Sequence, residues 1–182
     1  MRVRTTDLVP DEALQRLWRL YSEALGELRT LAVQRHVMTR DEFDGVMRDR
    51  RVAKYVAEDD DGTPVGLATL TDDLDAVPLI SPDYFAHRWP RWYAERRIWY
   101  AGFVAVDRTA RAAQVFPEFM AALGRLPGER GGIVAMDFSR QREAADRMPA
   151  AVGRLLAHAV PGTHAERLDE QSYWAYEFPA ST

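Results

Sequence analysis

The strongest indication of the fold comes from the segment Ile98-Trp99-Tyr100-Ala101-Gly102-Phe103-Val104-Ala105-Val106 and from the turn after it, Asp107-Arg108-Thr109-Ala110-Arg111-Ala112-Ala113-Gln114. Residues 97–106 predict a nearly continuous apolar strand, and a helix is expected from about Phe116 to Leu126. The first amide groups of a helix have no partner within the helix, and the partial positive charge there attracts anions such as a pyrophosphate. This order of strand, arginine-bearing turn and helix indicates a nucleotide-cofactor site.

Length and composition set the class of protein. The chain has 182 residues, of which 47% are hydrophobic, so residues 1–182 are expected to form a single domain with a packed core. Because there is no cysteine, a disulfide framework, a thiolate zinc site and a cysteine nucleophile are excluded. The four histidines have no HxxxH-like spacing, and no metal is expected.

Charge and hydropathy indicate the expected location of the protein and the kinds of partner it has. The N-terminus has no apolar signal-peptide core and no window reaches membrane-spanning length, so a soluble, cytoplasmic protein without membrane contact is expected. The formal net charge is -4, which argues against a nucleic-acid partner. Lys54 is the only lysine, so nearly every basic side chain is an arginine.

Residues before this stretch predict a strand, two helices and a hairpin. Residues 2–5 form the first strand, and a helix begins at Pro10, Asp11 and Glu12. The capping-box sequence that starts at Thr39 opens a second helix. The clearest hairpin has strands at 52–58 and 65–70, joined by a turn containing Gly62.

Residues after Gly132 predict a strand, a helical region and a terminal hairpin. A buried strand is expected at 133–138, followed by helical sequence from the N-cap Ser139 to Val160 with a break at Pro149. Two last strands are expected at 165–168 and 172–178, joined by a turn at Asp169-Glu170.

This order of elements resembles the GNAT N-acetyltransferase superfamily over nearly the whole chain. Val104-Ala105-Val106-Asp107 followed by Arg111 is similar to the end of the family's fourth strand and the first arginine of its R/Q-x-x-G-x-G/A pyrophosphate loop. In that alignment Gln114 and Phe116 occupy the positions of the loop's small residues. The resemblance implies an α/β (α+β) fold with a mixed, mostly antiparallel central sheet of six to seven strands and about four flanking helices.

The resemblance also implies how a cofactor binds. An acyl thioester would lie between the fourth and fifth strands, with its carbonyl polarised by a backbone N–H near Phe103 or Val104. Acetyl-CoA or another acyl-CoA is the implied co-substrate, without a metal. The residues implied to bind it are Phe103, Val104, Ala105, Val106, Arg108, Arg111, Ala112, Ala113 and Gln114.

Four side chains are candidates for proton transfer: Glu95, Tyr100, Asp137 and Tyr173. A carboxylate is needed to take the proton of the attacking amine, and Glu95 and Asp137 flank the two strands concerned. Alternatively, Glu95 pairs with Arg96 or Arg97 and Asp137 caps the next helix. Either tyrosine could protonate the leaving thiolate or simply pack with its hydroxyl hydrogen-bonded.

Residues 72–96 form an aromatic insert between the third and fourth strands. Its rings offer binding area on a rigid scaffold, so substrate selection is assigned to Tyr84, Trp89, Trp92 and Tyr93. A short helix is expected at Ser81-Pro82-Asp83, interrupted at Pro90. The alternative is that the rings cover the core or form a dimer contact.

The leading hypothesis is an acyl-CoA-dependent N-acyltransferase in which the amine of a small molecule attacks the thioester directly. One alternative is an acyltransferase that uses an acyl carrier protein as partner. The other is a GNAT-fold protein that binds a ligand or a partner without catalysis, because a fold alone does not determine chemistry. Independently of these functions, a homodimer is one expected assembly.

Overall fold

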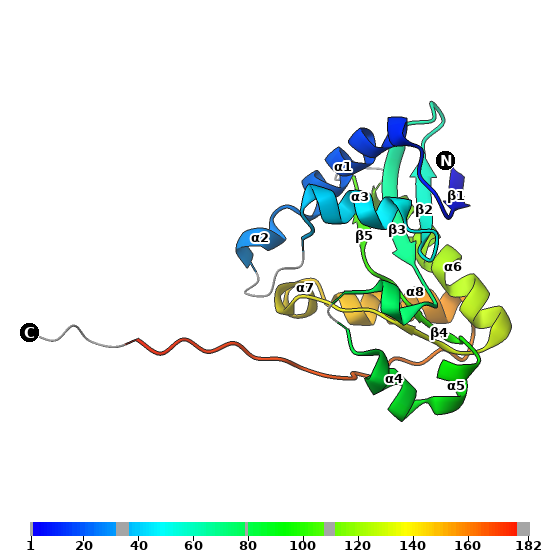
Figure 1. The fold of residues 1–182 in the computed structure, drawn as a ribbon, viewed down its shortest axis with the longest axis vertical. Helices are drawn as coiled ribbons and strands as arrows, with labels where there is room; N and C mark the ends of the chain where they lie inside the picture. The colour runs from blue at the N-terminus through cyan, green and yellow to red at the C-terminus, as the bar shows by residue number, and fades with distance from the viewer. Residues whose placement is uncertain (1, 32–36, 79, 108–111, 178–182) are drawn as a thin grey trace, which may run out of the picture.

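An antiparallel sheet lies at the centre of the protein (Figure 1), and the computed structural model describes residues 2–31, 37–78, 80–107 and 112–177. The sheet has the strand order β1-β2-β3-β5. A second sheet consists of the parallel pair β4-β6, and a single bridge between Thr71 and Tyr100 connects the two. The strands are β1 (Arg2–Thr6), β2 (Ala53–Glu58), β3 (Pro64–Leu70), β4 (Ile98–Tyr100), β5 (Val104–Val106) and β6 (Ile133–Ala135).

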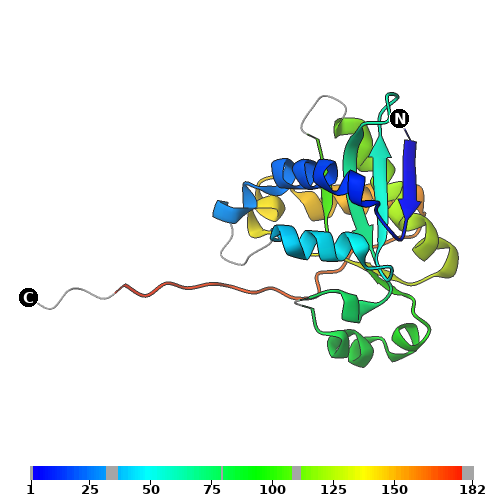
Figure 2. The same ribbon diagram turned by 45° about the horizontal axis from the view of Figure 1, so that its top comes forward.

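Helices cover both faces of this sheet (Figures 1 and 2). In chain order they are α1 (Asp11–Leu25), α2 (Leu28–Leu31), α3 (Arg40–Arg48), the 3₁₀ helix η1 (Leu74–Ala76), α4 (Pro82–Arg88), α5 (Pro90–Ala94), α6 (Ala112–Arg130), α7 (Arg140–Ala144) and α8 (Met148–Ala159). The mixed α/β class and the mostly antiparallel sheet are confirmed. The described residues form more helices than the four expected, and their six strands divide into sheets of four and two.

Alternation along the strands divides the core into two layers. One layer contains Val56, Leu67 and Ala105 of the sheet with buried residues of α1 and α3, among them Phe43. The neighbouring strand positions, such as Tyr55 and Ala68, pack against α6 and α8 on the other face. Because successive side chains of a strand point to opposite faces, each strand of the predicted hairpin contributes side chains to both core layers.

Gly66 of β3 brings α6 close to the sheet. A Cβ at this position would lie 2.6 Å from Cε2 of Phe119 and 2.7 Å from Cγ1 of Val115, both fully buried residues of α6. The missing side chain therefore sets the distance between this helix and the sheet.

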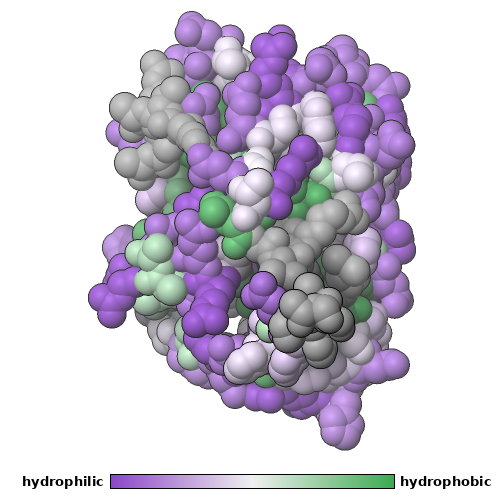
Figure 3. Space-filling view, turned by 90° about the vertical axis from the view of Figure 1, so that its left-hand side faces the viewer, coloured by the Kyte–Doolittle hydropathy of each residue, from purple (hydrophilic) through white to green (hydrophobic). Residues whose placement is uncertain are grey.

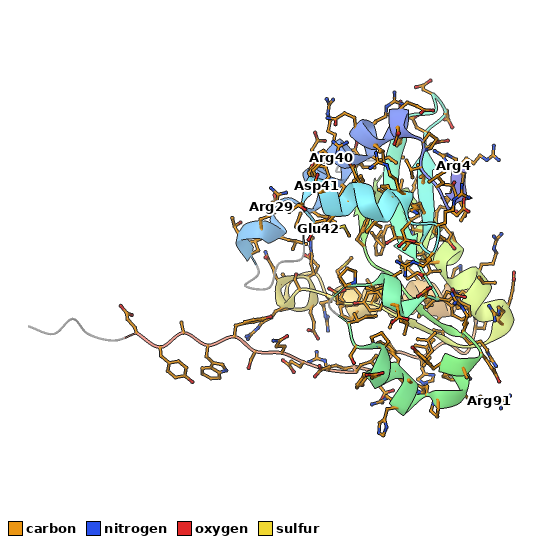
Figure 4. All side chains as sticks on the ribbon, viewed as in Figure 1. Arg4, Arg29, Arg40, Asp41, Glu42 and Arg91 are labelled. Carbon is orange, nitrogen blue, oxygen red and sulfur yellow. The ribbon has the colours of Figure 1, made fainter. Side chains whose placement is uncertain are left out.

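The capping box predicted at the start of α3 is confirmed. The Thr39 amide donates to Oε2 of Glu42 at 2.7 Å, and the hydroxyl of Thr39 accepts from the Glu42 amide at 3.4 Å. Glu42 is labelled at the start of this helix in Figure 4. The cap fixes the helix so that Phe43 and Met47 enter the core.

The aromatic insert folds into the short helices α4 and α5, below the sheet in Figure 1. Ser81 caps α4, and Pro90 separates the two helices as predicted. The insert covers a third core cluster that contains Phe85, Ile98 and Tyr100. Phe85 is buried in this cluster, and Trp89, Trp92 and Tyr93 are partly buried against it.

The predicted strand 97–106 is interrupted. Thr71, just after β3, pairs with Tyr100, whereas the Thr69 amide donates to the carbonyl of Phe103 at 3.1 Å. Thr69 and Thr71 are two positions apart, but the residues opposite them, Phe103 and Tyr100, are three positions apart. This is a β-bulge, which the apolar pattern alone did not predict. The predicted strand 133–138 is shorter for a related reason, because its ladder with β4 ends at Ala135.

Two helix boundaries also differ from prediction. Helix α6 begins at Ala112 rather than near Phe116 and continues to Arg130, with Pro117 and Pro127 inside it. The break between α7 and α8 precedes Pro149, which lies in the first turn of α8, where a proline costs no hydrogen bond.

The two predicted C-terminal strands are wrong for residues 165–177. This segment is extended and exposed, but it pairs with no strand of the described part of the chain. Strand formation needs a neighbouring backbone, and local sequence does not supply one. Among the described residues, no helix is both long and apolar enough to cross a membrane.

Candidate functional site

The β-bulge at Ala101–Gly102 separates two strands that are paired on its other side. Up to the bulge β4 pairs with β6, and the last contact is the Ala101 amide donating to the carbonyl of Ala135 at 3.0 Å. Beyond it, β5 pairs only with β3 among the described strands. The chain after Ala135 is no longer in a strand ladder, so the two backbones diverge from this point.

Backbone alternation aims two amides into this gap. Phe103, Ala105 and Asp107 face β3, as shown by the Phe103 carbonyl accepting from Thr69 and the Asp107 amide donating to Val65. The N–H groups of Val104 and Val106 therefore point to the opposite edge, toward the chain that follows β6. Within the described residues neither amide has a backbone partner. Phe103 and Val104 are the two residues whose amides were predicted to polarise a carbonyl. Of these, it is the Val104 N–H that points toward the gap.

Tyr100 and Asp137 meet where the strands diverge. The hydroxyl of Tyr100, the last residue of β4, donates to Oδ1 of Asp137 at 2.7 Å. Burial, and then the adjacent Asp137 carboxylate, raise the pKa of Tyr100 well above its usual value, so the phenol stays protonated. Tyr100 is 8% exposed, whereas Asp137 is exposed. The pair thus consists of a fixed donor and an accessible carboxylate.

The helix cap expected of Asp137 is made by another residue. Ser139 is buried and its hydroxyl accepts from the Arg142 amide at 3.4 Å, which caps α7. The Asp137 carboxylate, two residues earlier, accepts from Tyr100 instead.

Glu95 lies at the other end of β4. It accepts from Nε of Arg91 at 2.9 Å and from Nη1 of Arg97 at 2.8 Å. Hydrogen bonds from these two arginines hold the pKa of Glu95 below its usual value. Arg91 is labelled at the outer end of α5 in Figure 4. The structure therefore does not bring Glu95 to the Tyr100–Asp137 pair.

The residues predicted to bind a pyrophosphate are only partly described. Arg108 and Arg111 lie outside the described residues. Ala112, Ala113 and Gln114 belong to the first turn of α6, and Gln114 is exposed. Phe116 is partly buried and packs against the core layer between the sheet and α6.

The predicted substrate-binding aromatics surround the third core cluster. Trp89, Trp92 and Tyr93 are partly buried against it, and Tyr84 is 37% exposed. Because Tyr100 belongs to the same cluster, the insert covers the side of the sheet on which the Tyr100–Asp137 pair lies. Tyr173 lies in the extended C-terminal segment and is 47% exposed.

Two hollows lie near the insert. One of about 140 Å³ is lined by Asp72, Asp73, Leu74, Asp75, Tyr93, Arg96 and Ile98, and Arg96 pairs with Asp72 at 2.7 Å. The other, of about 250 Å³, is lined by residues 88–92. Figure 3 shows a largely hydrophilic face toward α2 and α7, with small hydrophobic areas near its centre.

Sequence reasoning missed the bulge and the residue that supports it. The Thr71 hydroxyl donates to the carbonyl of Arg51 at 2.7 Å, and the Thr71 backbone exchanges two hydrogen bonds with Tyr100. The available signal was Gly102, since a glycine inside a strand pattern indicates a bulge or a close backbone approach.

Comparison with solved structures gives the same fold. The chain resembles a probable acetyltransferase (15% identity, 100% of this chain and 99% of the other, TM-score 0.54). It also resembles a ribosomal-protein-alanine N-acetyltransferase from Brucella melitensis biovar Abortus 2308 (14%, 96% and 99%, TM-score 0.52). A third is the structure of AAC(6′)-Iy in complex with the bisubstrate analogue CoA-S-monomethyl-acetylneamine (14%, 95% and 100%, TM-score 0.51).

These likenesses show that the chain has the fold of the GNAT acetyltransferases, as the sequence pattern predicted. No protein-family model matches the sequence, and no curated protein does so.

Proposed function

We propose that the protein is an acyl-CoA-dependent N-acyltransferase that transfers an acyl group to the amine of a small molecule. The observation that carries the proposal is the divergence of the strands at the Ala101–Gly102 bulge, with the Val104 amide and the Tyr100–Asp137 pair beside it. The GNAT-fold structure bound to an analogue that joins CoA to an acetylated amine supports acyl-CoA as the donor.

Each group has a role in direct transfer. The Asp137 carboxylate takes a proton from the ammonium form of the acceptor, because only a neutral amine has a free electron pair for attack. Tyr100 orients this carboxylate through its hydrogen bond. The amine nitrogen bonds to the thioester carbon, and the Val104 N–H stabilises the negative charge on the oxygen.

The intermediate then collapses. The C–S bond breaks and sulfur leaves as a thiolate. The acceptor nitrogen, which carries a positive charge after the attack, gives up a proton to this thiolate, and the products are an amide and the free thiol of CoA. No covalent bond to the protein forms at any step. In this proposal the Val106 amide, which lies on the same edge as that of Val104, binds the pantetheine chain that carries the thioester.

Ligand binding and turnover are tested separately. CoA, acetyl-CoA and a long-chain acyl-CoA are each added in a thermal-shift experiment, where a ligand at about a hundredfold excess over its Kd stabilises the folded state by about 2.7 kcal/mol. Turnover is then measured with a thiol-reactive dye across a panel of amines. Because the chain has no cysteine, the dye reports only released CoA.

The results distinguish the functional classes. A thermal shift with thiol release supports the proposal, and the amine that gives the highest kcat/KM identifies the acceptor class. A shift without release on any amine indicates a binding protein. The absence of a shift with all three ligands would overturn the role of acyl-CoA, and the same panel repeated with an acylated carrier protein would then test that donor.

A further inference from the structure

The core layer of α6 and α8 extends along both sides of the bulge. It contains Trp99 and Ala101 before the bulge and Val104 after it. Tyr100 and Phe103, which alternate with these residues, belong to other core clusters. Because successive side chains of a strand point to opposite faces, Tyr100 and Phe103 both lie on the face of the sheet away from α6.

Asp137 lies on this face as well. Its neighbours Met136 and Phe138 pack in the layer of α6, whereas its own carboxylate accepts the hydrogen bond from Tyr100. The group proposed to take the proton of the amine is therefore opposite α6. An amine that Asp137 deprotonates has to approach the thioester carbon from this same face.

The acyl-CoA would reach the gap from the other face. The sequence predicts its pyrophosphate at the first turn of α6, and α6 packs on the face that carries the Val104 side chain. A thioester that passes from α6 into the gap and accepts from the Val104 N–H directs its acyl group to the opposite face. The side chain next to this amide on that face is Phe103.

The ring of Phe103 is held from behind by two buried rings. It meets Tyr21 of α1 edge to face, with 4.8 Å between ring centroids, and its centroid is 6.5 Å from that of Phe43 of α3. Tyr21 and Phe43 are fully buried, and the Tyr21 hydroxyl accepts from the Met38 amide at 2.9 Å. Figure 2 shows α1 and α3 on this face of the sheet. Because a close-packed interior leaves no free volume, the Phe103 ring cannot withdraw into it.

The other side of the Phe103 ring remains accessible. Phe103 is only partly buried, and the preceding residue, Gly102, is exposed. Apart from its chain neighbours, a Cβ at Gly102 would meet within 4 Å a single atom of the described residues, the Thr69 hydroxyl oxygen at 2.9 Å. The backbone is therefore bare beside a ring whose position is fixed.

Given the acyl-CoA function proposed above, on which this inference rests, we propose that Phe103 ends the space for the acyl group and restricts the donor to short chains such as acetyl and propionyl. A longer chain has to displace the ring toward Tyr21 and Phe43, and overfilling a packed region is unfavourable. Phe103 takes no part in proton transfer, so its role is to determine specificity.

The test measures Kd by titration calorimetry for CoA and for acetyl-, propionyl-, butyryl- and hexanoyl-CoA, without an acceptor amine. In the parent, affinity is expected not to increase beyond propionyl-CoA, because further methylene groups find no apolar surroundings. In Phe103→Ala, each methylene group that enters the vacated space is expected to lower Kd about fourfold, which corresponds to about 0.8 kcal/mol. Phe103→Leu, which keeps an apolar side chain, is measured as a second variant and should admit butyryl-CoA.

The matched control is Trp18→Ala. Trp18 belongs to the same aromatic cluster, with its ring 5.7 Å from that of Tyr21 and 5.3 Å from that of Phe43, but no ring contact of the described residues joins it to Phe103. Its removal loosens the cluster and leaves Phe103 in place, so Kd should depend on chain length as in the parent. Circular dichroism verifies that all variants are folded.

The outcomes separate this inference from the proposed function. A parent Kd that falls with every added methylene group shows an open acyl site and overturns the inference alone. Equal profiles for the parent and both Phe103 variants show that another residue limits the chain, which also overturns it. If no acyl-CoA binds the parent, the proposed function and the inference both fail. If the expected profiles occur without thiol release on any amine, Phe103 is supported as the limit of the acyl site and only the catalytic step fails.

Discussion

Tyr100 and Asp137 have different roles in one hydrogen bond. The buried phenol holds its proton, since burial and the carboxylate both raise its pKa. It therefore acts as a donor that positions the exposed carboxylate, and Asp137 is the group that can accept a proton from an amine. Glu95, by contrast, is an exposed carboxylate held by Arg91 and Arg97 at the far end of β4.

Asp137→Asn is expected to lower kcat by roughly 10²- to 10⁴-fold, because an amide cannot accept the proton of the amine. The measurement is the rate of CoA thiol release at saturating acyl-CoA. Asp146→Asn is the matched control, since Asp146 pairs with Arg142 on the surface at 2.7 Å and should leave kcat unchanged. Equal rates for the two variants would exclude Asp137 as the base.

Lys54 gives a prediction on pH and stability. This only lysine is fully buried, and its ammonium donates to the carbonyls of Asp7 at 3.0 Å and Asp49 at 2.6 Å. Burial lowers its pKa to about 8, while the carboxylates of Asp49 and Asp7 oppose the shift.

The unfolded chain therefore binds more protons than the folded one between pH 8 and the ordinary lysine value of 10.5, and stability rises with pH in that window. Urea unfolding is expected to show a gain on the order of 1 kcal/mol from about pH 7 to about pH 9.5 that is absent in Lys54→Met. If both proteins respond equally to pH, Lys54 does not titrate in this range.

At the scale of elements, two glycines should respond oppositely to the same change. Gly66→Ala on β3 places a Cβ 2.6 Å from the Phe119 ring, so a loss of about 1–3 kcal/mol in the free energy of unfolding is expected. Gly45 lies within α3, where an added methyl group would meet no atom within 4 Å, and Gly45→Ala should stabilise the protein by about 0.5–1 kcal/mol. The denaturant midpoint of Gly66→Ala should therefore lie below that of the parent, and that of Gly45→Ala above it. This pair of results would verify the close packing of α6 on the sheet.

Elements specified by nearby residues could be predicted from the sequence. The Thr39 capping box, the hairpin around Gly62 and the short helix that begins at Ser81-Pro82-Asp83 each depend on residues a few positions apart, and all three are confirmed. The pairing of Tyr100 with Asp137 depends on the parallel alignment of β4 with β6. The sequence identified both side chains as candidates but did not predict their contact.

Elements that depend on distant partners were harder to predict. A one-residue bulge leaves an apolar run looking continuous, so the break after Tyr100 was missed. Helix α6 was expected to start near Phe116, where its apolar stripe becomes clear, yet the helix begins at Ala112 and Val115 is already part of the core. For residues 165–177 the composition favoured strands, but no pairing edge follows from composition.

In the molecule as a whole, the bulge lies between the two sheets and beside the proposed acyl site. It ends the contact of β6 with β4 and opens the gap beside Val104. A ligand bound in this gap is expected to stabilise β6, because strands gain most of their stability from neighbours. Amide hydrogen exchange of residues 133–135 should therefore become slower when CoA is added, and equal rates with and without CoA would contradict binding beside β6.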